Sequence, residues 1–429
     1  MRPSNLRDAY KVAISANLGW GFELYDMLTY VYATPYFAPL FFPSGNYIAS
    51  VLAALLTLVL GYFARPIGAV ILGHLGDRLG RKTTWFMSLL GMGIATTLIG
   101  FLPTYYQVGI AATILLALLR ITQGIFLAGE WAGGMTITVE FAPTARMRGF
   151  LGGISQSGAA VASLFGAAAL ALTSALAPTK AAMESYGWRI IFWFGVIPLI
   201  IALIVRWKIS ESKPWLVKAK PNPERIPIAA LLRKYGLFVL IAVLVIFGES
   251  LIYYGSIGYF GTLIPLLGYS REFVIYASLA AGLSWLIIAP FFGMLSDRLG
   301  MRKYLLLILY LIDAALLYPV WYLVTLHNTL TFILGTVLMG ILFGSQYSIL
   351  PAWLGENIET RVRYSGIGFI INLGVALSSF APYISTYLLS TVGKVNPVLA
   401  ISLVTIIGAI IAAVFVALSP RDNITDELS

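Results

Sequence analysis

Seven charged side chains lie within stretches of the sequence that are otherwise strongly apolar. Five are acids, Glu23, Asp26, Glu130, Glu249 and Asp313, and two are arginines, Arg65 and Arg120. A charge at the centre of a bilayer costs about 3 kcal/mol or more, so such residues are candidates for binding or moving ions. Because the acids outnumber the arginines by three, some acids must be protonated, hydrated or bound to a cation.

Asp26 and Arg120 are expected at a similar depth, near the middle of two apolar helices. Burial favours the protonated form of a carboxyl group, whereas a nearby arginine favours the ionised form. A carboxyl group that gains and loses an arginine partner during a conformational cycle would therefore load and release a proton. We predict an Asp26–Arg120 pair that couples to protons, with Glu23 and Glu130 continuing a hydrated path. The alternative is a permanent salt bridge that only joins the two helices.

Other polar and aromatic residues in the apolar stretches are candidates for contact with a small ligand. The guanidinium fork of Arg65 suits a carboxylate, although Arg65 is equally suited to neutralise Glu23 or Glu130. Glu249 is expected to contact substrate or a proton, and Asp313 to be part of the scaffold. Aromatic rings near the acids could surround a cationic ligand or stack on a sugar. The predicted substrate-binding residues are Arg65, Gln123, Trp20, Tyr30, Gln156, Glu249, Tyr253, Tyr254, Gln346 and Asn372.

The composition excludes an ordinary water-soluble globule. Of the 429 residues, 59% are hydrophobic and 11% are charged, against about 25% charged residues in soluble domains. A spanning helix needs about 20 mostly apolar residues, and the sequence predicts twelve of them. The expected spans are 12–40, 47–73, 83–103, 107–142, 149–176, 187–208, 237–267, 271–295, 304–326, 329–355, 364–392 and 396–419.

Lysine and arginine are distributed unevenly between the two sides of this arrangement. Of the 28 basic residues, 22 fall on the side that carries both termini and a central segment, here counted from residue 206 to 234. Four fall on the opposite side, and Arg65 and Arg120 lie inside spans. Basic loops favour the cytoplasm, so we predict a multi-pass protein of the cell membrane with both termini cytoplasmic. The net charge of +10 then reflects topology.

The chain repeats itself. GHLGDRLGRK at 73–82 corresponds to GMLSDRLGMRK at 293–303, and further along Gly124 aligns with Gly340 and Gln156 with Asn372. These matches predict two six-helix halves, 1–208 and 237–429, joined by a basic cytoplasmic linker at 209–236. Halves of this sort usually place a ligand site between them near the middle of the bilayer.

The loop motif at 73–82 resembles the signature of the major facilitator superfamily, and the resemblance covers nearly the whole chain. ELYD (23–26), ARPIG (64–68), RITQG (120–124), GEWAGG (129–134) and ENIETRVRYSG (356–366) resemble its metabolite/proton symporters. SESKPWL (210–216) is similar to a sugar-porter signature. The resemblance implies a twelve-helix all-α membrane fold and alternating-access transport, often driven by protons, of small organic acids or zwitterions. It also implies that a monomer is sufficient.

Charged residues of the repeated loops are expected to hold the cytoplasmic side closed. Asp77 could also meet the positive N-terminal end of the eleventh helix. Such contacts must break when the cavity opens inward, so moderate strength suits them. The alternative is that these are basic loops with incidental partners. The predicted gate residues are Asp77, Arg81, Glu140, Arg148, Asp297, Arg302, Glu356 and Arg363.

The sequence favours a secondary active transporter that carries a small organic acid or zwitterion together with protons. A sugar or polyol porter or uniporter is the nearest alternative, and a non-transporting sensor is another. No P-loop, HExxH or GxSxG motif supports an enzyme. With no cysteine and only two histidines, neither a metal nor a cofactor is expected. The expected partners are the substrate, protons and the lipid bilayer, with no nucleic acid.

Overall fold

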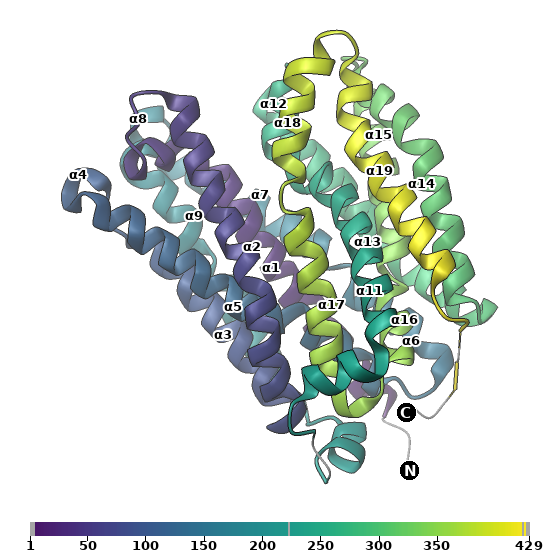
Figure 1. Ribbon diagram of the computed structural model, residues 1–429. Helices are drawn as coiled ribbons and strands as arrows, with labels where there is room; N and C mark the ends of the chain where they lie inside the picture. The colour runs from purple at the N-terminus through teal and green to yellow at the C-terminus, as the bar shows by residue number, and fades with distance from the viewer. Residues whose placement is uncertain (1–4, 222–223, 423, 426–429) are drawn as a thin grey trace.

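The computed structural model describes residues 5–221, 224–422 and 424–425, except for the side chains of Ile48 and Arg271. Residues 222–223 of the predicted linker and both extreme ends of the chain therefore lie outside the described residues. Within the described part, regular structure is entirely helical. Both termini lie at the same end of the helix bundle, the lower end in Figure 1.

Within the first half, α1 contacts α2, α5, α6, α7, α9 and α10. The helices of this half are α1 (Leu6–Phe41), α2 (Tyr47–Arg78), α3 (Arg81–Ile99), α4 (Tyr105–Val108), α5 (Ile110–Phe141), α6 (Arg148–Ser155), α7 (Gly158–Leu176), α8 (Lys180–Ala182), α9 (Trp188–Phe194) and α10 (Val196–Trp207). Short turns of other helix types lie between them at Ala145–Met147 and Met183–Gly187.

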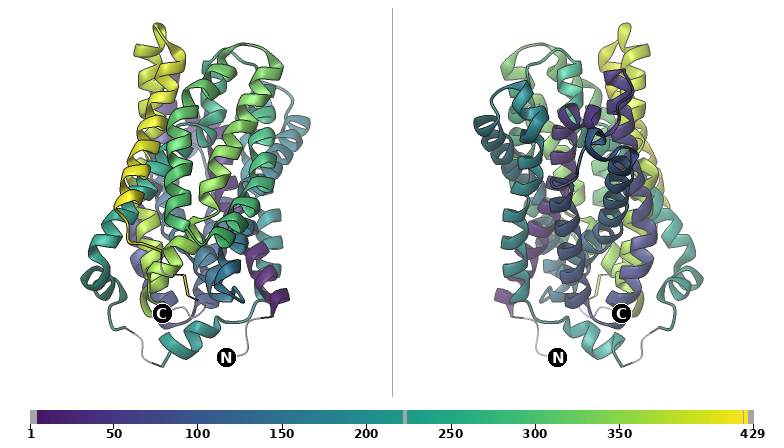
Figure 2. Two further views of the ribbon diagram at one scale, coloured as in Figure 1. Left: turned by 90° about the vertical axis from the view of Figure 1, so that its right-hand side faces the viewer. Right: turned by 90° about the vertical axis from the view of Figure 1, so that its left-hand side faces the viewer.

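The second half follows a linker that contains one helical turn, Trp215–Ala219. Its helices are α11 (Pro227–Tyr254), α12 (Phe260–Leu266), α13 (Arg271–Leu299), α14 (Arg302–Thr325), α15 (Thr329–Tyr347), α16 (Leu350–Asn357), α17 (Arg363–Ser378), α18 (Ala381–Thr391) and α19 (Pro397–Leu418). Short 3-10 turns occur at Ile257–Tyr259, Thr360–Val362 and Val392–Lys394. The two views of Figure 2 show the helices of both halves running side by side along the long axis of the bundle.

Ten helical segments of the described chain are long and apolar enough to cross a membrane. The expected spans 12–40 and 83–103 are the helices α1 and α3, which do not meet that criterion of length and composition. The first of them carries Glu23 and Asp26 among its buried residues. The count of twelve spanning helices therefore stays a prediction.

Several expected spans are interrupted. The helical conformation is interrupted between α6 and α7 at Gln156 and Ser157. It is interrupted again between α17 and α18 at Ser379 and Phe380. The span expected at 237–267 stops at Tyr254 and resumes as α12 after a 3-10 turn. Apolar composition predicts that a segment crosses the bilayer, but it does not report such breaks, because the residues on both sides remain apolar.

Glycines bring helices of the two halves into backbone contact at the lower end. A Cβ atom on Gly293 of α13 would lie 2.1 Å from the carbonyl oxygen of Gly149 in α6, and one on Gly153 would lie 2.4 Å from that of Ala289. On the other side, a Cβ on Gly73 of α2 would lie 2.9 Å from the Cα of Ser365 in α17. Small residues allow this close approach of membrane helices.

We predict that Gly293→Leu shifts the protein toward a conformation that is open at the lower end. Overpacking costs about 1–3 kcal/mol, which changes the ratio of open to closed molecules by at least about fivefold. The sequence has no cysteine, so spin labels can be attached selectively to Arg146→Cys and Arg298→Cys. These two exposed positions flank the contact, and the distance between their labels reports the separation of α6 from α13. Gly236→Leu is the control, because a Cβ there meets nothing within 4 Å. An unchanged distance distribution in Gly293→Leu would contradict the prediction.

Candidate functional site

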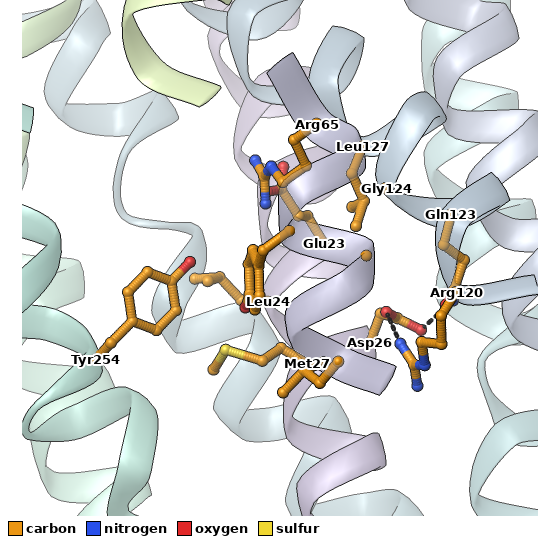
Figure 3. A pocket seen from close by; sticks show the side chains of 13 residues that line it. Glu23, Leu24, Asp26, Met27, Arg65, Arg120, Gln123, Gly124, Leu127 and Tyr254 are labelled. Atoms are coloured by element: carbon orange, nitrogen blue, oxygen red, sulfur yellow. Dashed lines mark hydrogen bonds and ion pairs between the residues drawn. The ribbon is translucent and has the colours of Figure 1, made fainter. Parts of the chain in front are cut away.

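Asp26 of α1 is the centre of a buried polar cluster in the first half (Figure 3). Its carboxylate oxygens accept hydrogen bonds from Arg120 Nη1 at 3.2 Å, from Gln123 Nε2 at 2.7 Å and from Thr96 Oγ1 at 2.8 Å. The Arg120 guanidinium also lies 3.6 Å from the ring centroid of Tyr30. Asp26 and Arg120 are each 2% exposed, so this ion pair joins α1, α3 and α5 out of contact with bulk water.

Arg65 of α2 connects the two halves. Its Nη2 donates to Glu23 Oε1 at 2.7 Å, and its Nε donates to Asn372 Oδ1 of α17 at 2.7 Å. Asn372 in turn donates to the carbonyl oxygens of Ala128 at 3.0 Å and Gly368 at 2.7 Å. Of the two roles considered for Arg65, this conformation shows the counter-ion role, with Glu23 as the partner.

Glu130 of α5 has an arginine partner that the sequence analysis missed. Arg206 of α10 binds both of its carboxylate oxygens, each at 2.8 Å, and stacks on the ring of Trp85 with 3.6 Å to the centroid. Arg206 was counted only as a basic residue of the segment 206–234, but it lies in the last turn of α10 and is 0% exposed. The apolar run VIPLIIALIVRW, which includes it, was the available signal. A Cβ on Gly19 would lie 2.0 Å from Glu130 Oε1, so the pair fills the space beside α1.

Arg206 changes the charge balance of the buried residues. With three arginines, the acids of the first half are each matched: Glu23 with Arg65, Asp26 with Arg120 and Glu130 with Arg206. The predicted path from Asp26 through Glu23 to Glu130 consists in this conformation of three separate ion pairs. Of the five acids of the apolar stretches, the two that form no ion pair among the described residues, Glu249 and Asp313, lie in the second half.

Aromatic rings from both halves meet at the centre. Trp20 and Trp131 stack with ring centroids 5.7 Å apart, and Tyr347 lies against both at 5.8 and 6.0 Å. Trp285 contacts Tyr347 at 5.0 Å and Tyr253 at 6.1 Å. We call these five residues the central aromatic cluster.

The remaining predicted ligand residues lie around this cluster or away from it. Gln156 accepts a hydrogen bond from the Trp131 indole at 2.9 Å. Gln346, beside Tyr347, donates to Asp313 at 2.6 Å. The Tyr30 hydroxyl donates to the carbonyl oxygen of Ala54 at 2.9 Å inside the first half, so in this conformation only its ring contributes to the charged centre.

A small cavity of about 30 Å³ lies beside the two upper ion pairs. Its polar lining consists of Glu23, Asp26, Tyr62, Arg65, Arg120, Gln123 and Tyr254. Tyr62, which the sequence analysis missed, contacts Tyr254 of the second half with ring centroids 5.4 Å apart. A buried water needs about 10–15 Å³, whereas ligand pockets measure about 300–1,000 Å³. The cavity therefore has room for water but not for a metabolite in this conformation.

At the lower end, one acid of each half caps a helix of the other half. Asp77 of α2 accepts hydrogen bonds from the backbone N–H groups of Tyr364 and Ser365 in the first turn of α17, at 3.3 and 2.9 Å. Asp297 of α13 accepts the equivalent bonds from Gly149 and Phe150 in the first turn of α6, at 2.9 and 2.7 Å. The partial positive charge of a helix N-terminus stabilises both carboxylates.

The other predicted gate residues form two matching networks around these caps. Arg81 binds Asp77 and donates to the carbonyl oxygen of Thr360 at 2.6 Å, while Arg302 binds Asp297 and donates to that of Ala145 at 3.1 Å. Glu140 pairs with Arg363 at 3.0 Å, and Glu356 pairs with Arg148 at 3.3 Å and with Arg302 at 3.0 Å. Each network crosses between the halves, so together they hold the lower end closed.

Two further acids, which the sequence analysis missed, support these networks. Glu211 of the linker accepts hydrogen bonds from the backbone N–H groups of Arg81 and Lys82 at the start of α3. Asp422, after α19, accepts from the backbone N–H of Lys303 at the start of α14 at 3.1 Å. Partial burial raises the pKa of Asp422. Each half is thus tied at its third long helix to the segment that follows its last helix.

Comparison with known proteins agrees with this architecture. The model of the Major Facilitator Superfamily matches residues 17–378, and matches again over 286–427. The chain belongs to the major facilitator superfamily. It is 36% identical over 407 residues to the inner membrane metabolite transport protein YhjE of Escherichia coli K12. The aligned region covers 91% of this chain and 90% of that protein.

Other members of the superfamily resemble the chain over most of its length. The proline/betaine transporter of Escherichia coli K12 is 25% identical, over 96% of this chain and 85% of that protein. The structure of the proton:xylose symporter XylE bound to 6-bromo-6-deoxy-D-glucose superposes with a TM-score of 0.76 at 16% identity, covering 98% of each chain. At that identity the likeness to XylE shows the fold. The protein is therefore a multi-pass membrane transporter with the all-helical major facilitator fold.

The Glu130–Arg206 pair generates a prediction about stability. Arg206→Met leaves a buried carboxylate without its partner, which costs about 3–5 kcal/mol. We expect the double variant Glu130→Gln/Arg206→Met to recover most of that loss, because no unpaired charge remains. Thermal unfolding of the wild type, both single variants and the double variant in the same detergent measures this coupling. Equal stability of Arg206→Met and the double variant would contradict it.

Proposed function

We propose that this transporter is a proton-coupled symporter of a small zwitterion or organic acid, working by alternating access. The observation that carries the proposal is the Asp26–Arg120 pair at 3.2 Å, which lines the same cavity as Arg65 and Glu23 at the boundary between the halves. A carboxylate beside an arginine is stabilised, whereas a buried carboxyl group without such a partner favours binding of a proton. A movement that separates the two side chains therefore loads a proton.

Arg65 supplies the contact for a carboxylate. Substrate binding would exchange Glu23 for the substrate carboxylate in front of the Arg65 guanidinium. A carboxylate can accept two parallel hydrogen bonds from the N–H groups of a guanidinium. The released Glu23 then favours the protonated form, so binding of substrate and binding of a proton assist each other. Because Arg65 also donates to Asn372 of α17, the same exchange affects the contact between the halves.

The central aromatic cluster favours a zwitterion among the carboxylate substrates. A substituted ammonium group is attracted to the faces of tryptophan and tyrosine rings, and Trp20, Trp131 and Tyr347 present stacked faces at the boundary between the halves. One relative is named a proline/betaine transporter. Each of the two compounds in that name carries a carboxylate and a substituted ammonium group. The second candidate function, a sugar or polyol porter, is supported here by the aromatic rings. Such a substrate has no carboxylate that could bind the Arg65 guanidinium.

The proposed cycle also assigns an orientation. The excess of basic residues at the lower end indicates that this end faces the cytoplasm. The two charge networks close that end, so the structure corresponds to a state closed to the cytoplasm. We also propose that a monomer is sufficient, as the resemblance to the superfamily implies.

Asp26→Asn is expected to abolish proton-driven accumulation, because an amide cannot exchange a proton at this site. In proteoliposomes with an inward proton gradient and radiolabelled glycine betaine or proline, accumulation should fall to the level of protein-free liposomes. Exchange of substrate at equal concentrations on both sides should persist. Asp8→Asn, at a partly exposed residue of α1, is the matched control. Full accumulation by Asp26→Asn would reduce the Asp26–Arg120 pair to a structural bridge.

Arg65→Lys is expected to weaken substrate binding while keeping the positive charge. An ammonium group lacks the planar fork of a guanidinium, and losing one charge-assisted hydrogen bond of about 1.4 kcal/mol raises the half-saturating concentration about tenfold. Uptake measured against substrate concentration tests this, with carboxylate-free choline as a comparison compound. A tenfold change for choline as well would show that Arg65 does not act on the carboxylate.

A further inference from the structure

Two buried acids of the second half have no role in the cycle described above. Glu249 in α11 and Asp313 in α14 are each 1% exposed, and neither forms an ion pair within the described residues. The three acids of the first half each have an arginine. The second half therefore concentrates the whole excess of buried negative charge.

The surroundings of Glu249 supply no counter-ion. The fully buried Tyr310 hydroxyl interacts with the Glu249 carboxyl group, and neither group has any other hydrogen-bond partner within the described chain. The titratable groups that face Glu249 are Tyr310 and Asp313 of α14 and Tyr347 of α15. The neighbouring α19 carries no charged residue, and Arg363 of α17 is bound to Glu140 at the gate.

Asp313 is held from the adjacent helix α15. Gln346 Nε2 donates to Asp313 Oδ2 at 2.6 Å, while Gln346 Oε1 is buried without a hydrogen-bond partner in the described part of the structure. Glu249, Tyr310, Asp313 and Gln346 therefore form a polar group with several unused donor and acceptor positions. We call these four residues the second-half carboxyl site.

An ionised carboxylate in such a place is strongly disfavoured. Burying a charge without a partner costs several kcal/mol, and the group is instead neutralised. A protonated carboxyl group removes the charge and gains an O–H donor, which suits the unused acceptors of the site. A proton neutralises a carboxylate without requiring further ligands, so we take the neutralising ligand to be a proton.

We propose that both carboxyl groups of the second-half carboxyl site are protonated in this conformation, separately from Asp26, and that Glu249 releases its proton during transport. Glu249 lies one helical turn from Tyr253 of the central aromatic cluster on the same face of α11. It is on the side of Tyr253 nearer the start of α11, which follows the linker at the lower end. Opening of the lower end would bring water to Glu249. Its O–H bond would then break, the proton would leave to water, and a hydrated carboxylate would remain.

The release step rests on the proposed function, but the protonation does not. Infrared difference spectra of the protein in lipid at neutral pH, with and without deuterium exchange, detect the C=O stretch of protonated carboxyl groups. We expect Glu249→Gln and Asp313→Asn each to remove a component of that band. Glu272→Gln, at an exposed acid of α13, should leave it unchanged. A band that is identical in the wild type and both variants would overturn the proposal.

The second measurement is the number of protons that enter proteoliposomes with each substrate molecule. Glu249→Gln is expected to keep Asp26-dependent uptake but to carry about one proton fewer per substrate than the wild type; Glu249→Leu serves if the first variant does not fold. An unchanged ratio would overturn the proposal, and so would sodium-dependent uptake or loss of substrate binding. If the wild type moves no protons, the proposed symport fails, while the infrared result still decides whether this site is protonated.

Discussion

An ionised side chain inside a dry helix bundle needs a partner, and this requirement organises the first half of the protein. Asp26, Glu23 and Glu130 each contact an arginine from another helix. Breaking any of these pairs leaves an unpaired buried charge, which is far more costly than losing an exposed ion pair. The positions of α1, α2, α5 and α10 relative to one another are therefore tied to the protonation states of a few carboxyl groups.

The same physical chemistry takes a weaker form at the lower end. There the carboxylates of Asp77 and Asp297 bind backbone N–H groups of a helix from the opposite half. Each cap is reinforced by an arginine that also reaches a backbone carbonyl across the boundary. Such contacts are strong when dry and are readily replaced by water. Several contacts that can each be either dry or hydrated would suit the repeated opening and closing of the lower end that we propose.

Much of this arrangement follows from sequence patterns. The apolar stretches predicted a helical membrane protein, the repeated loop motif predicted related halves, and buried charge drew attention to Asp26 and Arg120, which the structure places in contact. Asp77 was expected near the start of the eleventh helix, and it lies there. The helical membrane fold and these two contacts could be predicted because length, period and charge are properties of the chain itself, whereas the relation between the two halves stays a prediction.

Other features depend on distances that no pattern contains. Arg206 lies at the end of an apolar stretch, where a loop position and a buried one have the same composition, and only its contact with Glu130 distinguishes them. The helix breaks at Gln156 and Ser379 and the support from Glu211 and Asp422 also arise from tertiary contacts. The roles of the site residues remain predictions, since contact alone does not show transport.

The space beside Gly19 has a consequence for how this sequence can change. The Glu130 and Arg206 side chains occupy the volume that any side chain at position 19 would need. A methyl group at position 19 would have to displace the ends of these two side chains, and the pair cannot lose one member without stranding the other. These three positions, remote in the chain, are therefore coupled, because a residue larger than glycine at position 19 requires the Glu130–Arg206 pair to shift.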